Sequence, residues 1–221
     1  MKRILFLLCI LLFSTFLSAE NDKETKVLIV TNMGKITVKL YNDTPLHRDN
    51  FIKLVQENKY DSVMFHRVIK LFMIQAGEKY APDDSVAAKS AGNEADYKIP
   101  AEIVFPKYFH KRGQLCAARQ SDNVNPGRAS SANQFYIVTG KHYTDHELDK
   151  MEIEQNVKLT PEQRDAYKTA GGAPHLDGTY TIFGEVVKGM KVVQKIELVI
   201  TDASDRPLKN VRIKTMKLLK K

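Results

Sequence analysis

The sequence predicts a single all-β domain, folded as a closed barrel with two flanking helices. Short segments rich in β-branched residues recur along most of the 221-residue chain, and only two isolated segments outside one insertion show helical spacing. The composition, with 43% hydrophobic and 27% charged residues, is ordinary for one folded domain of this length. A closed barrel is expected because it removes the exposed strand edges that such a chain must otherwise protect.

The barrel is expected to begin with a hairpin near the N-terminus. Lys26–Thr31 and Lys35–Tyr41 are rich in β-branched residues, and Met33-Gly34 supplies the turn between them. In the second segment apolar and polar residues alternate, which is typical of a half-buried strand.

Two short helices are expected to flank the strands. Thr44 followed by Pro45 is a helix start, with the threonine as N-cap. Phe51, Leu54 and Val55 recur at helical spacing, and the predicted helix spans Thr44–Asn58. Met190–Ile196 shows the same amphipathic spacing and predicts the second helix.

The remaining strands are read from short apolar runs. A polar, irregular stretch between the early and late runs, residues 81–100, predicts a long loop. The further strands are expected at Val63–Val68, Phe72–Gln75, Leu115–Ala118, Gln134–Val138, Tyr180–Phe183 and Val211–Leu218.

A helical insertion interrupts this strand pattern at about residues 143–170. Thr144–Glu147 and Thr160–Gln163 are capping boxes, each of which opens a helical stretch. Gly171-Gly172 closes the second stretch. The insertion, 143–172, is too short to own a core, so we expect it to belong to one domain over residues 26–218.

The first segment is predicted to be a secretory signal. Lys2 and Arg3 precede the apolar run Ile4–Leu12, and polar residues begin after the small residue Ala19. We therefore expect residues 1–19 to be removed on export, into the periplasm if the source is a diderm bacterium, with no stable membrane insertion afterwards. The alternative is an uncleaved N-terminal membrane anchor.

Charge alone does not predict a nucleic-acid partner. The formal net charge is +8, but the basic residues are spread along the chain and no recognition motif accompanies them. We expect a protein that binds no nucleic acid and is a monomer.

Cysteines and histidines do not predict a disulfide framework, a metal site or a cofactor. Only Cys9 and Cys116 are present, and Cys116 lies in an apolar strand where burial is expected. His142 and His146 have the spacing of one helix face, but the Thr144 cap between them disfavours helical geometry.

The segment from Phe65 to Gly77 carries the chemistry. Arg67 stands within a few residues of Phe72, Met73 and Gln75 on neighbouring strand-like pieces. An adaptable apolar pocket beside a permanent donor is one interpretation, and a core strand with a surface arginine is the other. His66 is expected on the opposite face of its strand, as a core residue.

This segment resembles the signature of the cyclophilin-type peptidyl-prolyl cis-trans isomerases. The similarity continues through Gly113–Ala118, Ala132–Ile137 and His175–Gly178 to Phe183-Gly184. The resemblance implies a closed antiparallel barrel of eight strands capped by the two helices, with the active groove on its outer face. The insertion is similar to those of bacterial members.

The resemblance also implies the site and the reaction. Arg67, Phe72 and Gln75 match catalytic positions, and Arg67 would hydrogen-bond to the prolyl nitrogen of a twisted X–Pro amide. No cofactor is implied, and the partners would be proline-containing polypeptides. The implied substrate-binding residues are Ile69, Met73, Ala118, Arg119, Gln120, Gln134, Tyr136, His175, Leu176 and Tyr180.

Some positions depart from the family pattern. His175 stands where many members have a tryptophan that binds cyclosporin, so sensitivity to that drug is in doubt. Tyr180 stands where others have histidine, and Arg119 replaces an asparagine that acts through its backbone. The alternative function is a proline-binding chaperone module without turnover, because uniform binding accelerates nothing.

Overall fold

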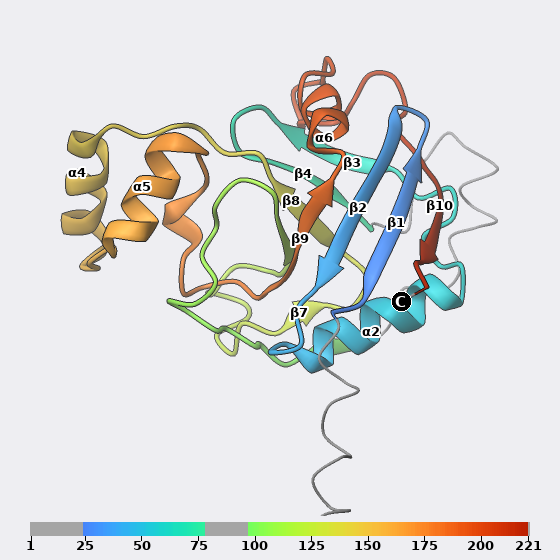
Figure 1. Ribbon diagram of the computed structural model, residues 1–221, viewed down its shortest axis with the longest axis horizontal. Coiled ribbons are helices and arrows are strands. Elements are labelled where there is room, and N and C mark those ends of the chain that lie inside the picture. Colours follow the sequence, from blue (N-terminus) through green and yellow to red (C-terminus); the bar gives the residue numbers. More distant parts are fainter. Residues whose placement is uncertain (1–23, 78–96, 221) are drawn as a thin grey trace, which may run out of the picture.

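An eight-stranded antiparallel sheet forms the body of the protein. The computed structural model describes residues 24–77 and 97–220 (Figure 1). The strands lie in the order β10-β1-β2-β9-β6-β8-β4-β3. They are β1 (Lys26–Thr31), β2 (Gly34–Leu40), β3 (Phe65–Ile69), β4 (Met73–Ala76), β6 (Gln114–Ala117), β8 (Phe135–Val138), β9 (Ile182–Lys188) and β10 (Ile213–Leu218).

The sheet is an open, strongly curled half-barrel, so the predicted closed barrel is wrong. β10 and β3 are its two edges. An isolated bridge between Met64 and Arg212 joins the segments before these strands. Further along β3, the amide of Val68 donates to the carbonyl oxygen of Asp205, at 2.8 Å. A loop therefore occupies the edge of β3 that β10 would need for closure, and it protects that edge in place of a strand.

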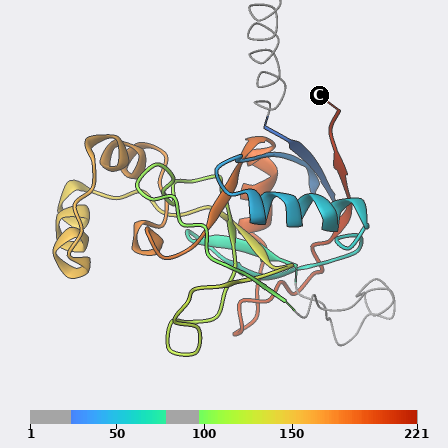
Figure 2. The same cartoon turned by 90° about the horizontal axis from the view of Figure 1, so that it is seen from below.

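The core fills the concave side of the sheet and is closed by two helices. Strand residues that alternate along the chain, such as Ile36, Val38 and Leu40, are fully buried. Helix α2 (Pro45–Gln56) packs against β9 and β10, and α6 (Met190–Glu197) packs against β2, β3 and β4. Seen from below, α2 runs across one end of the sheet (Figure 2). Both predicted flanking helices are present.

A distant carboxylate caps helix α2. The amides of Leu46 and His47 donate to the two oxygens of Glu102, at 3.0 and 2.9 Å. The ring Nδ1 of His47 lies 2.6 Å from the same carboxylate. Thr44 is the N-cap residue as predicted, but its buried hydroxyl has no hydrogen-bond partner among the described residues. The sequence alone did not identify Glu102 as the cap, because Glu102 lies far from helix α2 along the chain.

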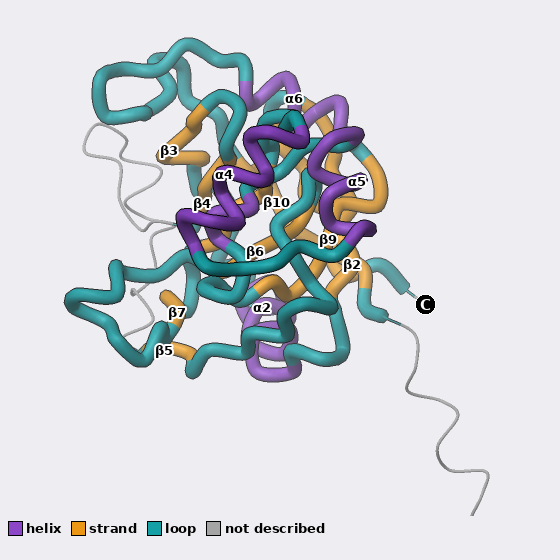
Figure 3. The backbone as a smooth tube through the Cα atoms, turned by 90° about the vertical axis from the view of Figure 1, so that its left-hand side faces the viewer, coloured by secondary structure: helices purple, strands orange, loops and turns teal. Residues whose placement is uncertain are grey.

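The insertion contains the two predicted helices. α4 (Asp145–Gln155) and α5 (Pro161–Thr169) each begin with a complete capping box, and these predictions are confirmed. The helices stand to one side of the sheet in Figure 1 and lie nearest the viewer, in front of the strands, in Figure 3. A small cluster holds them to the body, and its buried members are Phe109, Leu148, Met151, Leu159 and Tyr167.

The two ends of the insertion meet at a narrow neck. The amide of Gly172 donates to the carbonyl oxygen of Lys141, at 2.9 Å. A Cβ atom on Gly140, where φ is +58°, would lie 2.3 Å from the Cα of Gly172. A Cβ atom on Gly172 would lie 2.3 Å from the carbonyl oxygen of His110, so the neck requires glycine at both positions.

The other elements follow the sequence closely. The last two strands begin two residues later than expected, and β9 extends five residues further, to Lys188. A short ladder of β5 (Lys98–Ile99) and β7 (Ser130–Ser131) lies beside the main sheet, and the 3-10 helix η1 (Pro174–Leu176) precedes β9. The predicted signal, and most of the predicted loop at 81–100, lie outside the described residues. In the described ranges no helix has the length and apolarity needed to cross a membrane.

The Glu102 cap predicts a stability effect. The variant Glu102→Ala leaves two helix amides without their acceptor, so we expect the free energy of unfolding to fall by about 2–3 kcal/mol. Urea unfolding followed by circular dichroism measures this. Glu154→Ala removes an exposed pair with Lys150, the ion pair that Glu154 makes among the described residues, and should change stability by less than about 0.5 kcal/mol. Equal losses in the two variants would contradict the cap.

Candidate active site

The β3–β4 hairpin positions the first functional side chains. Arg67 on β3 pairs in register with Gln75 on β4. At the turn, Leu71 has φ +60° and its amide donates to the Glu197 carboxylate of α6, at 2.8 Å. The carbonyl oxygen of Phe72 accepts from the amides of residues 139 and 140. These bonds hold a turn that glycine would otherwise favour, and so fix where Phe72 stands.

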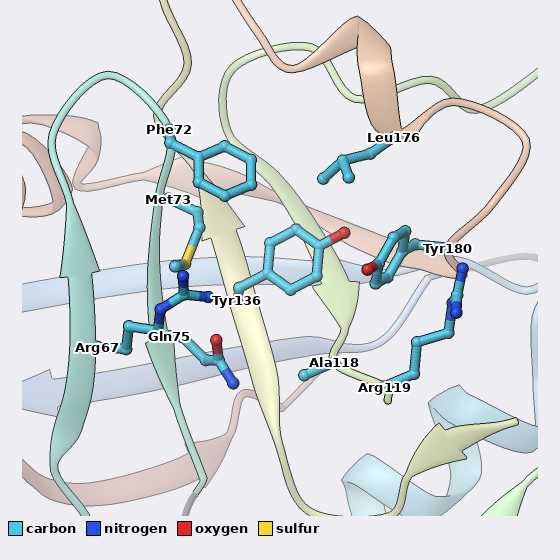
Figure 4. A pocket seen from close by; sticks show the side chains of 9 residues that line it. All are labelled: Arg67, Phe72, Met73, Gln75, Ala118, Arg119, Tyr136, Leu176 and Tyr180. Carbon is cyan, nitrogen blue, oxygen red and sulfur yellow. The ribbon is translucent and has the colours of Figure 1, made fainter. Parts of the chain in front are cut away.

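One pocket opens on the outer face of the sheet, beside this hairpin. Its volume is about 160 Å³. Its walls come from β3, β4 and β8, from the segment that follows β6, and from the segment around η1 (Figure 4). The nine lining residues are Arg67, Phe72, Met73, Gln75, Ala118, Arg119, Tyr136, Leu176 and Tyr180.

The guanidinium of Arg67 stands at the mouth of the pocket. Its side chain is 46% exposed, and its Nε donates to Asp205 Oδ2 at a distance of 3.4 Å. Asp205 belongs to a tight turn whose amides are held by the Asp202 carboxylate. Within the described residues, no acceptor contacts the two terminal nitrogens of Arg67. These donors cannot be deprotonated and are available to a ligand.

The apolar part of the pocket is built by side chains of limited mobility. Met73 is 2% exposed, and the ring of Phe72 packs on the His175 ring with centroids 5.2 Å apart. Leu176 reaches in from η1, opposite Phe72 (Figure 4). This hollow suits a small apolar ring better than a charged or extended group.

The polar side chains at the rim of the pocket are also held in place by contacts with their neighbours. The side-chain nitrogen Nε2 of Gln75 donates to Gln134 Oε1 at 3.0 Å. Across the pocket, the Arg119 guanidinium lies 4.2 Å from the centroid of the Tyr180 ring, and its Nε donates to the Thr179 carbonyl at 2.9 Å. Because Arg119 is engaged in this way, it shapes the rim and leaves Arg67 as the exposed donor.

The structure gathers nine of the thirteen predicted site residues around the pocket itself. Two more touch them directly, since Gln134 bonds to Gln75 and His175 packs on Phe72. Ile69 packs in the apolar cluster behind the pocket. Gln120 is the most removed, and its side chain accepts from Lys98 at 2.6 Å.

Sequence reasoning missed several residues that support the site. Asp205 beside Arg67 and Glu197 beneath the turn come from segments far along the chain, and no local pattern marks them. His110, Asp177 and Tyr167 form a buried polar chain behind the pocket and were also missed. Only Asp177 had a signal, because it stands inside a motif that was singled out.

Burial keeps the groups behind the pocket neutral. It raises the pKa of the Tyr136 hydroxyl and of the Cys116 thiol well above their usual values, and Cys116 is fully buried as predicted. Desolvation lowers the pKa of His175, at the exposed rim beside Phe72, and burial lowers the pKa of His66, on the strand beside Arg67, to about 4. No cluster of three metal-binding side chains occurs in the parts of the chain that the structure describes.

Comparison with known proteins assigns the chain to a family. Residues 26–218 match the model of the family described as cyclophilin type peptidyl-prolyl cis-trans isomerase/CLD. The chain therefore belongs to the family of cyclophilin-type peptidyl-prolyl cis-trans isomerases.

Individual relatives agree with this assignment. A Staphylococcus epidermidis protein named "Putative peptidyl-prolyl cis-trans isomerase" is 32% identical over 197 residues, which are 88% of this chain and 92% of that protein. "Peptidyl-prolyl cis-trans isomerase-like 2" of Rhizopus delemar is 31% identical over 92% of this chain. The chain spans only 30% of that longer relative.

Solved structures share the fold. The crystal structure of a cyclophilin type peptidyl-prolyl cis-trans isomerase from Cryptosporidium parvum aligns with a TM-score of 0.63 at 23% identity. The alignment covers 90% of this chain and 99% of that one. A second crystal structure of that protein, in the presence of the dipeptide Ala-Pro, aligns with a TM-score of 0.61.

The site predicts that the isomerisation rate varies little with pH above the range in which histidine gains a proton. Arg67 stays charged, and the lowered pKa of His175 keeps its ring neutral above about pH 6.5. We expect kcat/KM for isomerisation to vary by less than about twofold between about pH 6.5 and 8.5, and to fall only below that range as His175 gains charge. Stopped-flow assays in constant ionic strength buffers measure this. A change of more than about tenfold within the range would require a titrating catalytic group.

Proposed function

We propose that the protein catalyses rotation about X–Pro peptide bonds in polypeptide substrates. One observation carries the proposal: the exposed guanidinium of Arg67 stands at the mouth of an apolar pocket formed by Phe72, Met73 and Leu176. A proline ring fits such a pocket, and the guanidinium then lies beside the bond that must rotate.

The chemistry needs no covalent step. Amide resonance opposes rotation with a barrier of about 20 kcal/mol, and in the twisted amide the prolyl nitrogen regains a lone pair. A terminal nitrogen of Arg67 donates to that lone pair, and this hydrogen bond is absent in the planar amide. The interaction is therefore stronger in the transition state than in the ground state, which is the condition for a higher rate.

The other pocket residues divide the work of holding the substrate. Phe72, Met73 and Leu176 hold the proline ring, and Gln75, oriented by Gln134, donates to the carbonyl oxygen before proline. The carbonyl side then rotates while the ring stays fixed. The Ala-Pro dipeptide present with the Cryptosporidium parvum protein supports proline-containing ligands for this pocket.

We propose further that the substrates are exported polypeptides. The basic start and apolar run within residues 1–19 support export, because they have the layout of a secretory signal. Newly translocated chains whose folding waits on proline isomerisation are then the natural substrates.

Replacement of Arg67 tests the catalytic role. We expect Arg67→Ala to lower kcat/KM by about 10²–10³-fold, the usual loss for one transition-state donor. Arg67→Lys should recover only part of the activity, since lysine presents a single point charge. A protease-coupled assay on an Ala-Pro peptide measures both.

The matched control for this test is Arg48→Ala. Arg48 lies on α2, and among the described residues its side chain bonds to Asn42 and Asp49, so its loss should leave the rate within about twofold. If Arg67→Ala folds normally and isomerises at the wild-type rate, the protein binds proline without catalysing rotation.

Export has its own test. Expressed with its natural N-terminus in a diderm bacterium, the protein should be recovered from the periplasm with Glu20 as its first residue. N-terminal sequencing reads the cleavage site, and Ile10→Arg, which breaks the apolar run, should leave the protein unprocessed in the cytoplasm. Recovery of the wild type with Met1 intact in the membrane fraction would support the anchor instead.

A further inference from the structure

A buried carboxylate lies behind the pocket, one residue after Leu176. The side chain of Asp177 is 7% exposed and accepts three hydrogen bonds. Two of its donors are on His110, the backbone amide at 2.8 Å and ring Nδ1 at 2.9 Å. The third is the hydroxyl of Tyr167, at 2.6 Å. A buried carboxylate with this many donors is well satisfied and holds its neighbours in fixed positions.

His110 connects Asp177 to the wall of the pocket through hydrogen bonds. Its ring is fully buried, and its Nε2 lies 3.1 Å from the hydroxyl oxygen of Tyr136. Because Nδ1 faces the Asp177 carboxylate, the ring proton belongs on Nδ1 and Nε2 is left as an acceptor. The Tyr136 hydroxyl, whose raised pKa keeps it protonated, then donates to Nε2.

The other end of the chain of hydrogen bonds is in the helical insertion. Tyr167 belongs to α5 and is fully buried. Its ring packs edge to face on Phe109, the residue before His110, with centroids 5.6 Å apart. One polar path therefore runs from the insertion, through Asp177 and His110, to a residue that lines the pocket.

We propose that Asp177 is a positioning residue for substrate binding: with Tyr167 of the insertion, it fixes His110 and thereby holds the Tyr136 wall of the proline pocket. The inference rests on the proposed function of that pocket. A buried tyrosine hydroxyl needs a partner, and the Tyr136 ring lines the pocket, so a hydroxyl that loses His110 leaves this wall without a fixed position. The loss should therefore appear in binding, since Arg67 is untouched.

The test compares Asp177→Asn in two backgrounds. In the wild-type background we expect KM for an Ala-Pro peptide to rise about three- to tenfold with kcat within twofold. In the Tyr136→Phe background, where no hydroxyl needs to be held, Asp177→Asn should change KM by less than about 1.5-fold. An equal rise in both backgrounds would overturn the proposal, because the carboxylate would then act by general destabilisation.

A milder pair of variants keeps the test valid if Asp177→Asn folds poorly. Tyr167→Phe removes one donor to Asp177 and should raise KM about two- to threefold. Tyr143→Phe removes a hydroxyl of the same insertion that takes no part in this chain of hydrogen bonds, and should leave KM unchanged. Equal effects of the two would contradict the assigned path.

A spectroscopic readout separates this inference from the proposed function. Nitrogen-15 chemical shifts of the His110 ring should report a proton on Nδ1 in the wild type and an altered tautomer balance in Asp177→Asn. If the wild type shows this tautomer but does not isomerise the peptide, the proposed function fails while the positioning chain stands. A proton on Nε2 in the wild type would overturn the inference whatever the activity.

Discussion

The site depends on one contrast: a permanently charged hydrogen-bond donor lies beside an apolar pocket. The charge of Arg67 requires exposure, and an apolar hollow requires burial, so the two must meet at a boundary. The hairpin of β3 and β4 provides that boundary, because Arg67 is on the exposed side of the edge strand while Met73 on its neighbour is buried. The loop that lies along β3 serves both purposes, since it protects the strand edge and brings Asp205 to the guanidinium.

Fixed polar groups around the hollow give it a definite shape. Carboxylates from distant segments perform this task at two places: Glu197 holds the hairpin turn, and Asp177 satisfies the histidine behind Tyr136. Both are largely buried and accept more than one donor, so each limits the movement of its neighbours. The pocket walls are then ordered before any ligand arrives, which reduces the entropy lost on binding.

The sequence predicted those features whose signals are local. The capping boxes at Thr144 and Thr160 are complete within four residues, and both helices form where expected. Most of the pocket could be predicted too, through a motif resemblance that spans several segments. Features that depend on distant partners could not: Thr44 suggested its own hydroxyl as cap, and closure of the barrel depended on a loop path that no pattern encodes.

The narrow neck at Gly140 and Gly172 has an evolutionary consequence. Because the chain leaves and re-enters the body at adjoining points, the helical pair could be gained, lost or exchanged without moving any strand, at a loop-closure cost that changes slowly with length. Insertions of this kind normally leave the structure of the host domain unchanged. Here the hydroxyl of Tyr167 would leave with the graft, so a lineage that trimmed it would need another donor for Asp177.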